Sequence, residues 1–327
     1  MISTGAPDIA PAFVGDGRAL YFSRRVNGRW SIMQSRYRGE SWSPPLIASF
    51  SGKWNDLEAA AAPNGRYLIF ASDRPAAGAK GPLTSRYYGH DQVGGALWRI
   101  ELLGVVTGKL TRLPDPVNAG SSVWTPSIAT DGDLAFMRTD VASGRFRIFL
   151  ARSDGHSGYR SVRPLAFSTG AANDVDPALD PNERFLIFSS DRDTPGRDGA
   201  PGPEHLFIVR SPLSPHPMVC RLRFPGWSDT AISEVEARLS PDGTRLYFAS
   251  RHPDHAAGKP ASGAWDDGKA NIWSVRFSFL PRRAGGAPCS TSEVIGLTRS
   301  RSEQPTRWPP GQADSGPSGS SGRLPAR

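Results

Sequence analysis

Short stretches of alternating hydrophobic and polar residues recur along the chain, and five of them are versions of one pattern. Each copy has a segment of small residues or proline, then a turn, then a segment that alternates aromatic or aliphatic residues with polar ones. The copies are DIAPAFVGDGRALYFSRR (8–25), DLEAAAAPNGRYLIFASDR (56–74), WTPSIATDGDLAFMR (124–138), DVDPALDPNERFLIFSSDR (174–192) and EVEARLSPDGTRLYFASR (234–251). Because alternation with a period of two is typical of β-strands, each copy predicts a β-hairpin.

The turns of these hairpins carry a signal of their own. Four copies contain Asp-Gly or Asn-Gly, at Asp16-Gly17, Asn64-Gly65, Asp131-Gly132 and Asp242-Gly243. These dipeptides supply the positive φ angles that a tight hairpin needs, so Gly65 and Gly243 are predicted to have positive φ. The fourth copy has Asn182-Glu183 instead, which weakens the turn signal there and leaves the pattern intact.

A third strand follows each hairpin and is marked by an aromatic residue. The five segments are WSIMQSRY (30–37), ALWRIEL (96–102), FRIFLAR (146–152), HLFIVR (205–210) and NIWSVRF (271–277). A fourth strand sometimes follows, as in KLTRLP (109–114). A small sheet cannot bury both of its faces alone, whereas sheets arranged in a ring cover one another. The repeats therefore predict an all-β fold, a β-propeller of four-stranded antiparallel blades.

The repeat also resembles a known unit. The pattern E-x-x-P-x-x-S-P-D-G-x-x-L-x-F-x-S-x-R, clearest at 174–192 and 234–251, is similar to the WD-repeat-like unit of TolB-like β-propellers. The resemblance covers about residues 8–280. It implies the propeller fold, and a periplasmic location through the family. The chain lacks the N-terminal α/β domain of TolB, so a role in the Tol-Pal system is not implied.

Five hairpins are visible, whereas TolB-like propellers commonly have six blades. A missing N-terminal blade, a degenerate blade hidden between 75 and 123, and a true ring of five would each explain this. We assign residues 1–300 to the propeller, with EVIGLTR (293–299) as a candidate last strand of the fifth blade. Residues 301–327 are rich in Arg, Pro, Gly and Ser and are predicted to be a disordered tail.

Composition narrows the function classes. Of the net charge of +8, half lies in residues 282–327, so the remaining chain is nearly balanced and nucleic-acid binding is not expected. No apolar run is long enough to cross a bilayer, so membrane insertion is not expected either. Residues 1–13 show no features of a secretion signal. Cys220 and Cys289 have no metal-ligand spacing, and they leave the redox compartment open.

Antiparallel order places the start of each first strand and the end of each second strand on the same side of the ring. We call this side face one, and the side with the hairpin turns face two. The insertions 75–95, 193–204 and 252–269 therefore emerge on face one. RYYGHDQVGG (86–95) is the insertion richest in polar and aromatic residues, and loops on a rigid scaffold are common binding sites.

Acids recur at two fixed positions of the first strands. The first position holds Asp8, Asp56, Asp174 and Glu234, and the second, two residues later, holds Glu58, Asp176 and Glu236. Residues two apart in a strand point the same way, so both acids of a blade are expected on one side of their strand, near the mouth of the central channel.

Two interpretations of these acids are open. In the first, the acids line the opening of the central channel and attract a cation or metal there, together with residues of nearby loops: Trp54, Tyr88, His90, Asp91, Trp124, His252, Asp254 and His255. Alternatively, each acid pairs with an arginine near the end of a hairpin: Arg24, Arg74, Arg138, Arg192 or Arg251. We favour the structural ion pairs, because acids and arginines recur together at fixed spacing. His252 and His255 flank Asp254, but the sequence identifies no third ligand, so a metal remains unknown.

The sequence contains none of the motifs G-x-x-x-x-G-K-[ST], G-x-S-x-G or H-E-x-x-H, so no catalytic residue and no cofactor is predicted. The favoured function is a non-enzymatic binding module, monomeric, that contacts a protein or a cell-envelope glycan through face one. The alternative is a polysaccharide-active enzyme. TolB-type repeats also resemble those of oligogalacturonate lyases, and that resemblance implies a divalent metal held by histidines.

Overall fold

The computed structural model describes residues 8–39, 41–87, 90–104, 106–120, 122–194, 196, 202–224, 231–250 and 271–277. Within these residues the regular structure consists of 21 β-strands, and there is no helix. Accordingly, no described helix is long and apolar enough to span a membrane.

Five antiparallel sheets form the blades of the molecule. Blade 1 contains β1 (Asp8–Val14), β2 (Ala19–Val26), β3 (Arg29–Arg36) and β4 (Leu46–Ile47). Blade 2 contains β5 (Asp56–Ala61), β6 (Tyr67–Ser72), β9 (Ala96–Leu103) and β10 (Val106–Arg112). Blade 3 contains β11 (Val123–Ile128), β12 (Leu134–Thr139), β13 (Phe146–Ser153) and β14 (Tyr159–Pro164).

The last two blades continue the same order. Blade 4 contains β15 (Asp174–Leu179), β16 (Phe185–Ser190), β17 (His205–Arg210) and β18 (Met218–Arg221). Blade 5 contains β19 (Glu234–Leu239), β20 (Arg245–Ser250) and β21 (Asn271–Arg276). A separate two-stranded hairpin, β7 (Thr84–Tyr87) and β8 (His90–Val93), is inserted between β6 and β9 of blade 2.

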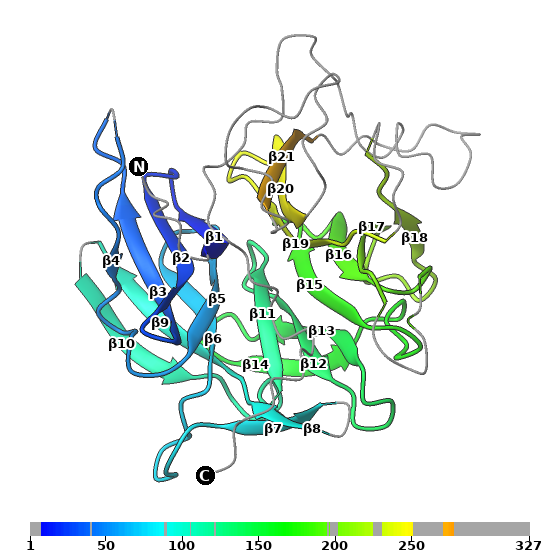
Figure 1. The fold of residues 1–327 in the computed structure, drawn as a ribbon, viewed down its shortest axis with the longest axis horizontal. Coiled ribbons are helices and arrows are strands. Elements are labelled where there is room, and N and C mark those ends of the chain that lie inside the picture. Colours follow the sequence, from blue (N-terminus) through cyan, green and yellow to red (C-terminus); the bar gives the residue numbers. More distant parts are fainter. Residues whose placement is uncertain are drawn as a thin grey trace.

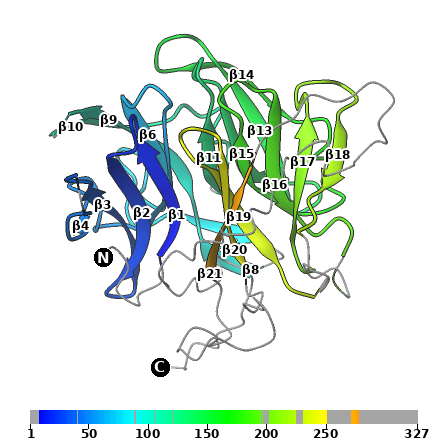
Figure 2. The ribbon, with the colours of Figure 1, turned by 90° about the horizontal axis from the view of Figure 1, so that it is seen from above.

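The blades follow one another around the molecule, with β1, β5, β11, β15 and β19 on the inner side (Figure 1 and, from above, Figure 2). Each of these inner strands contacts the next, and β19 also approaches β1. The fold is therefore a β-propeller, as the hairpin repeats predicted, and of the blade numbers left open by the sequence the structure has five. The segment 75–123 holds the β7–β8 hairpin and the outer strands of blade 2, not a further blade. EVIGLTR and the tail 301–327 lie outside the described residues.

The hydrophobic core is divided among the interfaces between neighbouring blades. The phenylalanines near the ends of the second strands are all buried: Phe22, Phe70, Phe136, Phe188 and Phe248. Between blades 4 and 5, for example, the Phe248 ring stacks on Phe224 with 4.6 Å between ring centroids. Successive side chains of each second strand point to opposite faces of the blade, so they pack in the interfaces with both neighbouring blades.

The hairpin turns confirm the predicted glycine conformations, with φ of 69° at Gly65 and 68° at Gly243. The turns are nevertheless longer than two residues. In blade 1 the strands are separated by four residues, Gly17 N donates to Val14 O, and Asp16 Oδ1 accepts from Arg18 N at 3.1 Å. The aspartate therefore caps the turn through its side chain, and the residue after it has positive φ; in blade 1 Gly15, before the aspartate, has positive φ as well. In blade 4 this position is taken by Glu183, at φ 57°.

Candidate functional site

Every inner strand contains a bulge at the same place. The register between the first and second strands of each blade shifts shortly after the strand begins. A non-glycine residue at each bulge has positive φ, between 44° and 57°: Ala10, Glu58, Thr125, Asp176 and Glu236. Such a conformation is unfavourable for residues with a Cβ, and it breaks the period-two alternation of side chains. The expectation that both acids of a blade share one side of the strand is therefore wrong, and their contacts differ.

The acid at the first position pairs within its own blade. Arg24 donates to Asp8 from Nε and Nη2, at 2.6 and 2.8 Å. Arg74 Nη2 lies 2.6 Å from Asp56 Oδ1, in a pair in which both side chains are buried. The same contact recurs at 2.6 Å between Arg192 and Asp174. These ion pairs are those that the recurrence of acids and arginines predicted.

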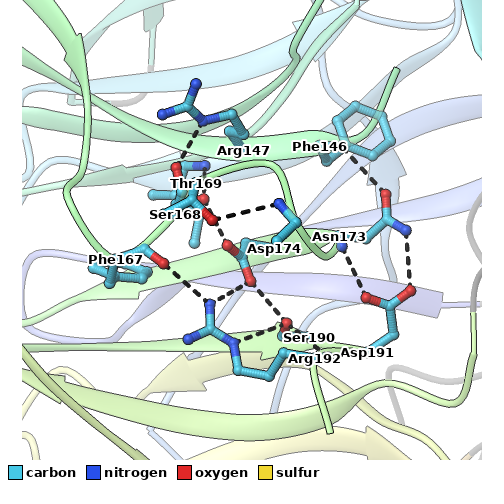
Figure 3. A network of polar contacts seen from close by, with 12 residues as sticks. Phe146, Arg147, Phe167, Ser168, Thr169, Asn173, Asp174, Ser190, Asp191 and Arg192 are labelled. Carbon is cyan, nitrogen blue, oxygen red and sulfur yellow. Dashed lines mark hydrogen bonds and ion pairs between the residues drawn. The ribbon is translucent and has the colours of Figure 1, made fainter. Parts of the chain in front are cut away.

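A wider polar network surrounds the pair in blade 4 (Figure 3). Asp174 also accepts hydrogen bonds of 2.7 Å from the hydroxyls of Ser168 and Ser190. Next to it, Asn173 donates from its backbone N and from Nδ2 to the two carboxylate oxygens of Asp191, at 2.8 and 3.1 Å.

This network also connects neighbouring blades. Asn173 Oδ1 accepts from the backbone N of Phe146, which begins the third strand of blade 3. In blade 2 the same arrangement is built from Asn55 and Asp73, with Trp30 N of blade 1 as the donor to Asn55 Oδ1. Asparagine and the second aspartate were missed by the sequence reasoning. Two recurring motifs in the sequence could have revealed them. Asn-Asp occurs at the start of the first strand in blades 2 and 4, and Ser-Asp-Arg occurs at the end of the second strand in the same blades.

Blades 3 and 5 depart from this scheme. Blade 3 has Ser122 at the first acid position, and Arg138 Nη1 donates to the carbonyl oxygen of Pro116 while its guanidinium lies 4.0 Å from the Phe149 ring centroid. In blade 5 the side chain of Glu234 lies 3.0 Å from Nδ1 of the buried His205 of blade 4. Arg251 lies outside the described residues.

The acids at the second position reach across blades. Glu58 Oε2 accepts from the backbone N and the hydroxyl of Thr125, both at 2.8 Å. Thr125 Oγ1 also lies 3.3 Å from Asp176 Oδ1, and Glu236 N donates to Asp176 Oδ2 at 3.2 Å. Within the described residues, Asp176 and Glu236 form no ion pair with an arginine near a hairpin end; Arg251, one of the predicted partners, lies outside those residues. Their bulged backbone brings their contacts to the neighbouring inner strands.

Two further residues, Glu204 and Arg238, interact electrostatically with these acids. We call Glu58, Asp176, Glu204, Glu236 and Arg238 the channel cluster. Burial, together with the charge of Asp176, raises the pKa of Glu58 to about 7. Burial and the same aspartate raise the pKa values of Glu204 and Glu236 to about 8 each. Burial also raises the pKa of Asp176, although Arg238 opposes the shift. Near neutral pH the cluster therefore holds protons that isolated carboxylic acids would release.

Arg238 is the cation of this cluster. It follows Glu236 by two residues in β19 and lowers the pKa values of Glu58, Asp176 and Glu236 through its charge. Its Nη1 donates to the carbonyl oxygen of Ala237 at 2.8 Å. Its Nε and Nη2 are buried and have no hydrogen-bond partner within the described part of the chain. The charge of Arg238 thus acts on three carboxyl groups of the cluster, and its hydrogen-bonding capacity is only partly used.

The remaining predicted site residues are more scattered. Trp124 is only 6% exposed and packs in the core between blades 2 and 3, with Nε1 donating to Ser122 Oγ. Trp54 is half-buried beneath the ammonium of Lys53. His90 begins β8 and the next residue, Asp91, is exposed. The other loop residues proposed for the mouth lie outside the described residues: Tyr88, His252, Asp254 and His255.

Comparison with known proteins identifies the fold. No protein-family model and no curated protein sequence matches the chain. Among solved structures, TolB from Acinetobacter baumannii matches with a TM-score of 0.51 at 12% identity, over 84% of this chain and 53% of that one. The chain has a TolB-like β-propeller fold. It spans about half the length of the TolB structure that it matches.

Other solved structures match with TM-scores below 0.5. A nidogen/laminin complex matches with a TM-score of 0.48 at 10% identity, over 83% of this chain and 76% of that one. A thermostable family-43 glycoside hydrolase matches with a TM-score of 0.48 at 13% identity, over 96% and 98% of the two chains. Because one propeller architecture hosts binding modules and enzymes alike, the fold alone does not determine the function.

Proposed function

We propose that this propeller is a binding module that contacts a protein or a cell-envelope glycan through face one. The channel cluster would bind a positively charged group of that partner. One observation carries the proposal: Glu58, Asp176 and Glu236 come from three different blades and are joined by hydrogen bonds near the face-one end of the inner strands. Thr125 links Glu58 to Asp176, and the backbone N of Glu236 donates to Asp176.

The charge balance of the cluster favours a cationic group. The cluster contains four carboxyl groups and one arginine; burial raises the pKa values of all four acids, and repulsion by Asp176 adds to the shift of the three glutamates. An ammonium or guanidinium group entering the cluster would offset that repulsion and favour the ionised acids. Binding of the cation is then coupled to proton release, so affinity should increase as the pH rises through about 7 to 8.

The alternative of a polysaccharide-active enzyme on the ring also has one supporting observation. Carboxyl groups with pKa values of about 7 to 8 are suited to act as general acids near neutral pH. The lyase version of this alternative depends on a divalent metal held by histidines. A stoichiometric divalent ion that stays bound through purification and leaves only on chelation would favour the enzyme over the binding module.

Calorimetric titration with a pentalysine peptide tests the binding site on the full chain. At about pH 9, where both acids are ionised, we expect binding that weakens at least about fivefold in Glu58→Gln and in Glu236→Gln, because each substitution then removes a negative charge and preserves side-chain shape. The matched control is Asp115→Asn. Asp115 is 87% exposed and pairs with Arg112 outside the cluster, so this variant has the same change in net charge. Absence of binding, or equal weakening in all three variants, would overturn the proposal.

A further inference from the structure

A second candidate site lies on face two, away from the channel cluster. A pocket of about 310 Å³ opens between blades 2 and 3. Its walls are the turn at 62–66 of blade 2, the turns at 129–132 and 153–159 of blade 3, and the end of β9. These are loops between strands, held on two blades whose shared core is well packed. Loops on a rigid scaffold at a blade interface are a common place for small ligands.

Tyr67 gives the pocket its most informative polar group. The residue is 6% exposed, and its ring packs in the core between blades 2 and 3. Its side chain lines the pocket, next to Arg99. A tyrosine combines an apolar ring with a hydroxyl that both donates and accepts hydrogen bonds. Tyr67 therefore gives this part of the pocket wall a hydrogen-bonding group on a side chain that is held in place by the core.

Arg99 and Tyr159 line the pocket next to Tyr67. The guanidinium of Arg99 lies 3.6 Å from the Tyr67 ring centroid, and its Nε donates to Glu101 Oε1 at 2.6 Å. Tyr159 lies close enough to Tyr67 for the charge of that phenol to raise the pKa of Tyr159, in addition to the larger effect of burial. Burial raises the pKa values of both tyrosines, so both remain protonated over the physiological range and can donate as well as accept hydrogen bonds.

The lining determines the class of ligand. Arg66 and Arg99 are matched by Glu101 and Asp131, so an ion of either sign would meet a like charge as well as an opposite one. The other polar groups are hydroxyls, amides and the His156 imidazole, a mixture of donors and acceptors. A volume of about 310 Å³ is at the lower end of small-molecule pockets. These features suit a small, neutral, polyhydroxylated molecule better than an ion or an apolar ligand.

We propose that this pocket binds a single neutral sugar residue, with the hydroxyls of Tyr67 and Tyr159 and the Arg99–Glu101 pair hydrogen-bonded to its hydroxyl groups. Planar ion pairs present donors and acceptors in fixed directions, which matches neighbouring hydroxyls on a sugar ring. The site is independent of the function proposed for face one.

Saturation-transfer NMR on the full chain tests the proposal with glucose, galactose, mannose and N-acetylglucosamine as probes. We expect at least one of them to bind with a dissociation constant of roughly millimolar size, as is usual for one small polar ligand. The corresponding uronate and amino sugar should bind at least about fivefold more weakly, because each adds a charge that meets a like charge in the pocket.

The matched variants are Tyr67→Phe and Tyr21→Phe. Both remove one hydroxyl from a buried tyrosine, but Tyr21, 3% exposed, borders a different pocket between blades 1 and 2. We expect Tyr67→Phe to weaken sugar binding at least about fivefold and Tyr21→Phe to leave it unchanged, with thermal melts confirming that both variants fold. Glu236→Gln, in the channel cluster, should also leave it unchanged. No binding by any neutral sugar, equal affinity in Tyr67→Phe, or tighter binding of a charged analogue would overturn the proposal.

Discussion

At the scale of single residues, the acids of one inner strand have two different roles. Asp56 and Glu58 are two positions apart, yet Asp56 pairs with Arg74 of its own blade and Glu58 contacts Thr125 of the next. The sequence predicted the acids and the pairs of the first position. It could not predict the bulge, because positive φ falls on Glu58, a residue type that rarely adopts it, and no glycine marks the site.

The raised pKa of Glu236 predicts how stability depends on pH. The folded-state pKa of about 8 exceeds the usual value of 4.5, so the folded protein binds this proton more tightly than the unfolded chain does. Protonated Glu236 therefore contributes to the stability of the folded state. This contribution is fully present below the pKa of Glu236 in the unfolded chain and is lost as the pH rises through the folded-state value of about 8. In Glu236→Gln this dependence is absent, and we expect the variant to exceed the parent in stability by roughly 1–3 kcal/mol at about pH 9.

Urea unfolding of parent and variant at about pH 5, 7 and 9 measures this difference, because the linkage relation fixes the sign at each pH. The exposed Asp115→Asn variant provides the control for a general change of net charge. Parallel stability profiles for Glu236→Gln and the parent would show that Glu236 does not retain its proton in the folded state.

At the scale of elements, the inner and outer strands of a blade differ in how well the sequence reveals them. The inner hairpins and third strands are buried on both faces, as in β16, and their alternating apolar residues predicted them closely. The fourth strands are less buried: both residues of β4 and four of the six residues of β14 are exposed, and β18 has one buried residue, Cys220. With less buried surface they need less regular apolar alternation, and so the sequence indicated them only sometimes.

Gly243 provides a test of the turn assignment. It has φ 68°, and a Cβ added there would meet no atom within 4 Å, so substitution acts through the backbone conformation alone. We expect Gly243→Val to destabilise the protein by roughly 1–3 kcal/mol, because a β-branched residue is strained at positive φ. Gly243→Asn should cost clearly less, since asparagine tolerates this conformation. Thermal melts of the two variants measure the difference, and equal losses would contradict the assignment.

At the scale of the whole molecule, the ring closes through contacts between β19 and β1, with the inner strands side by side (Figure 1). Polar networks at the blade 1–2 and 3–4 interfaces tie an inner strand to the preceding blade. The sequence predicted the ring because blades of this kind cannot bury their faces alone. It left the number of blades open because blade number depends on how tightly neighbouring sheets pack, which a repeat pattern does not specify.

The contact between β19 and β1 is made without residues 301–327, and this leads to a prediction for the tail. That segment has few apolar residues and much Gly, Ser, Pro and Arg, so it has little to contribute to a core. We expect a chain ending at residue 300 to melt within about 1 °C of the full chain. A chain ending at residue 270 loses β21 and the buried Trp273 and Phe277, and should melt at a clearly lower temperature. If removal of 301–327 alone lowers the melting temperature to a similar extent, the tail is part of the ring, because only a segment packed against the blades can stabilise them in this way.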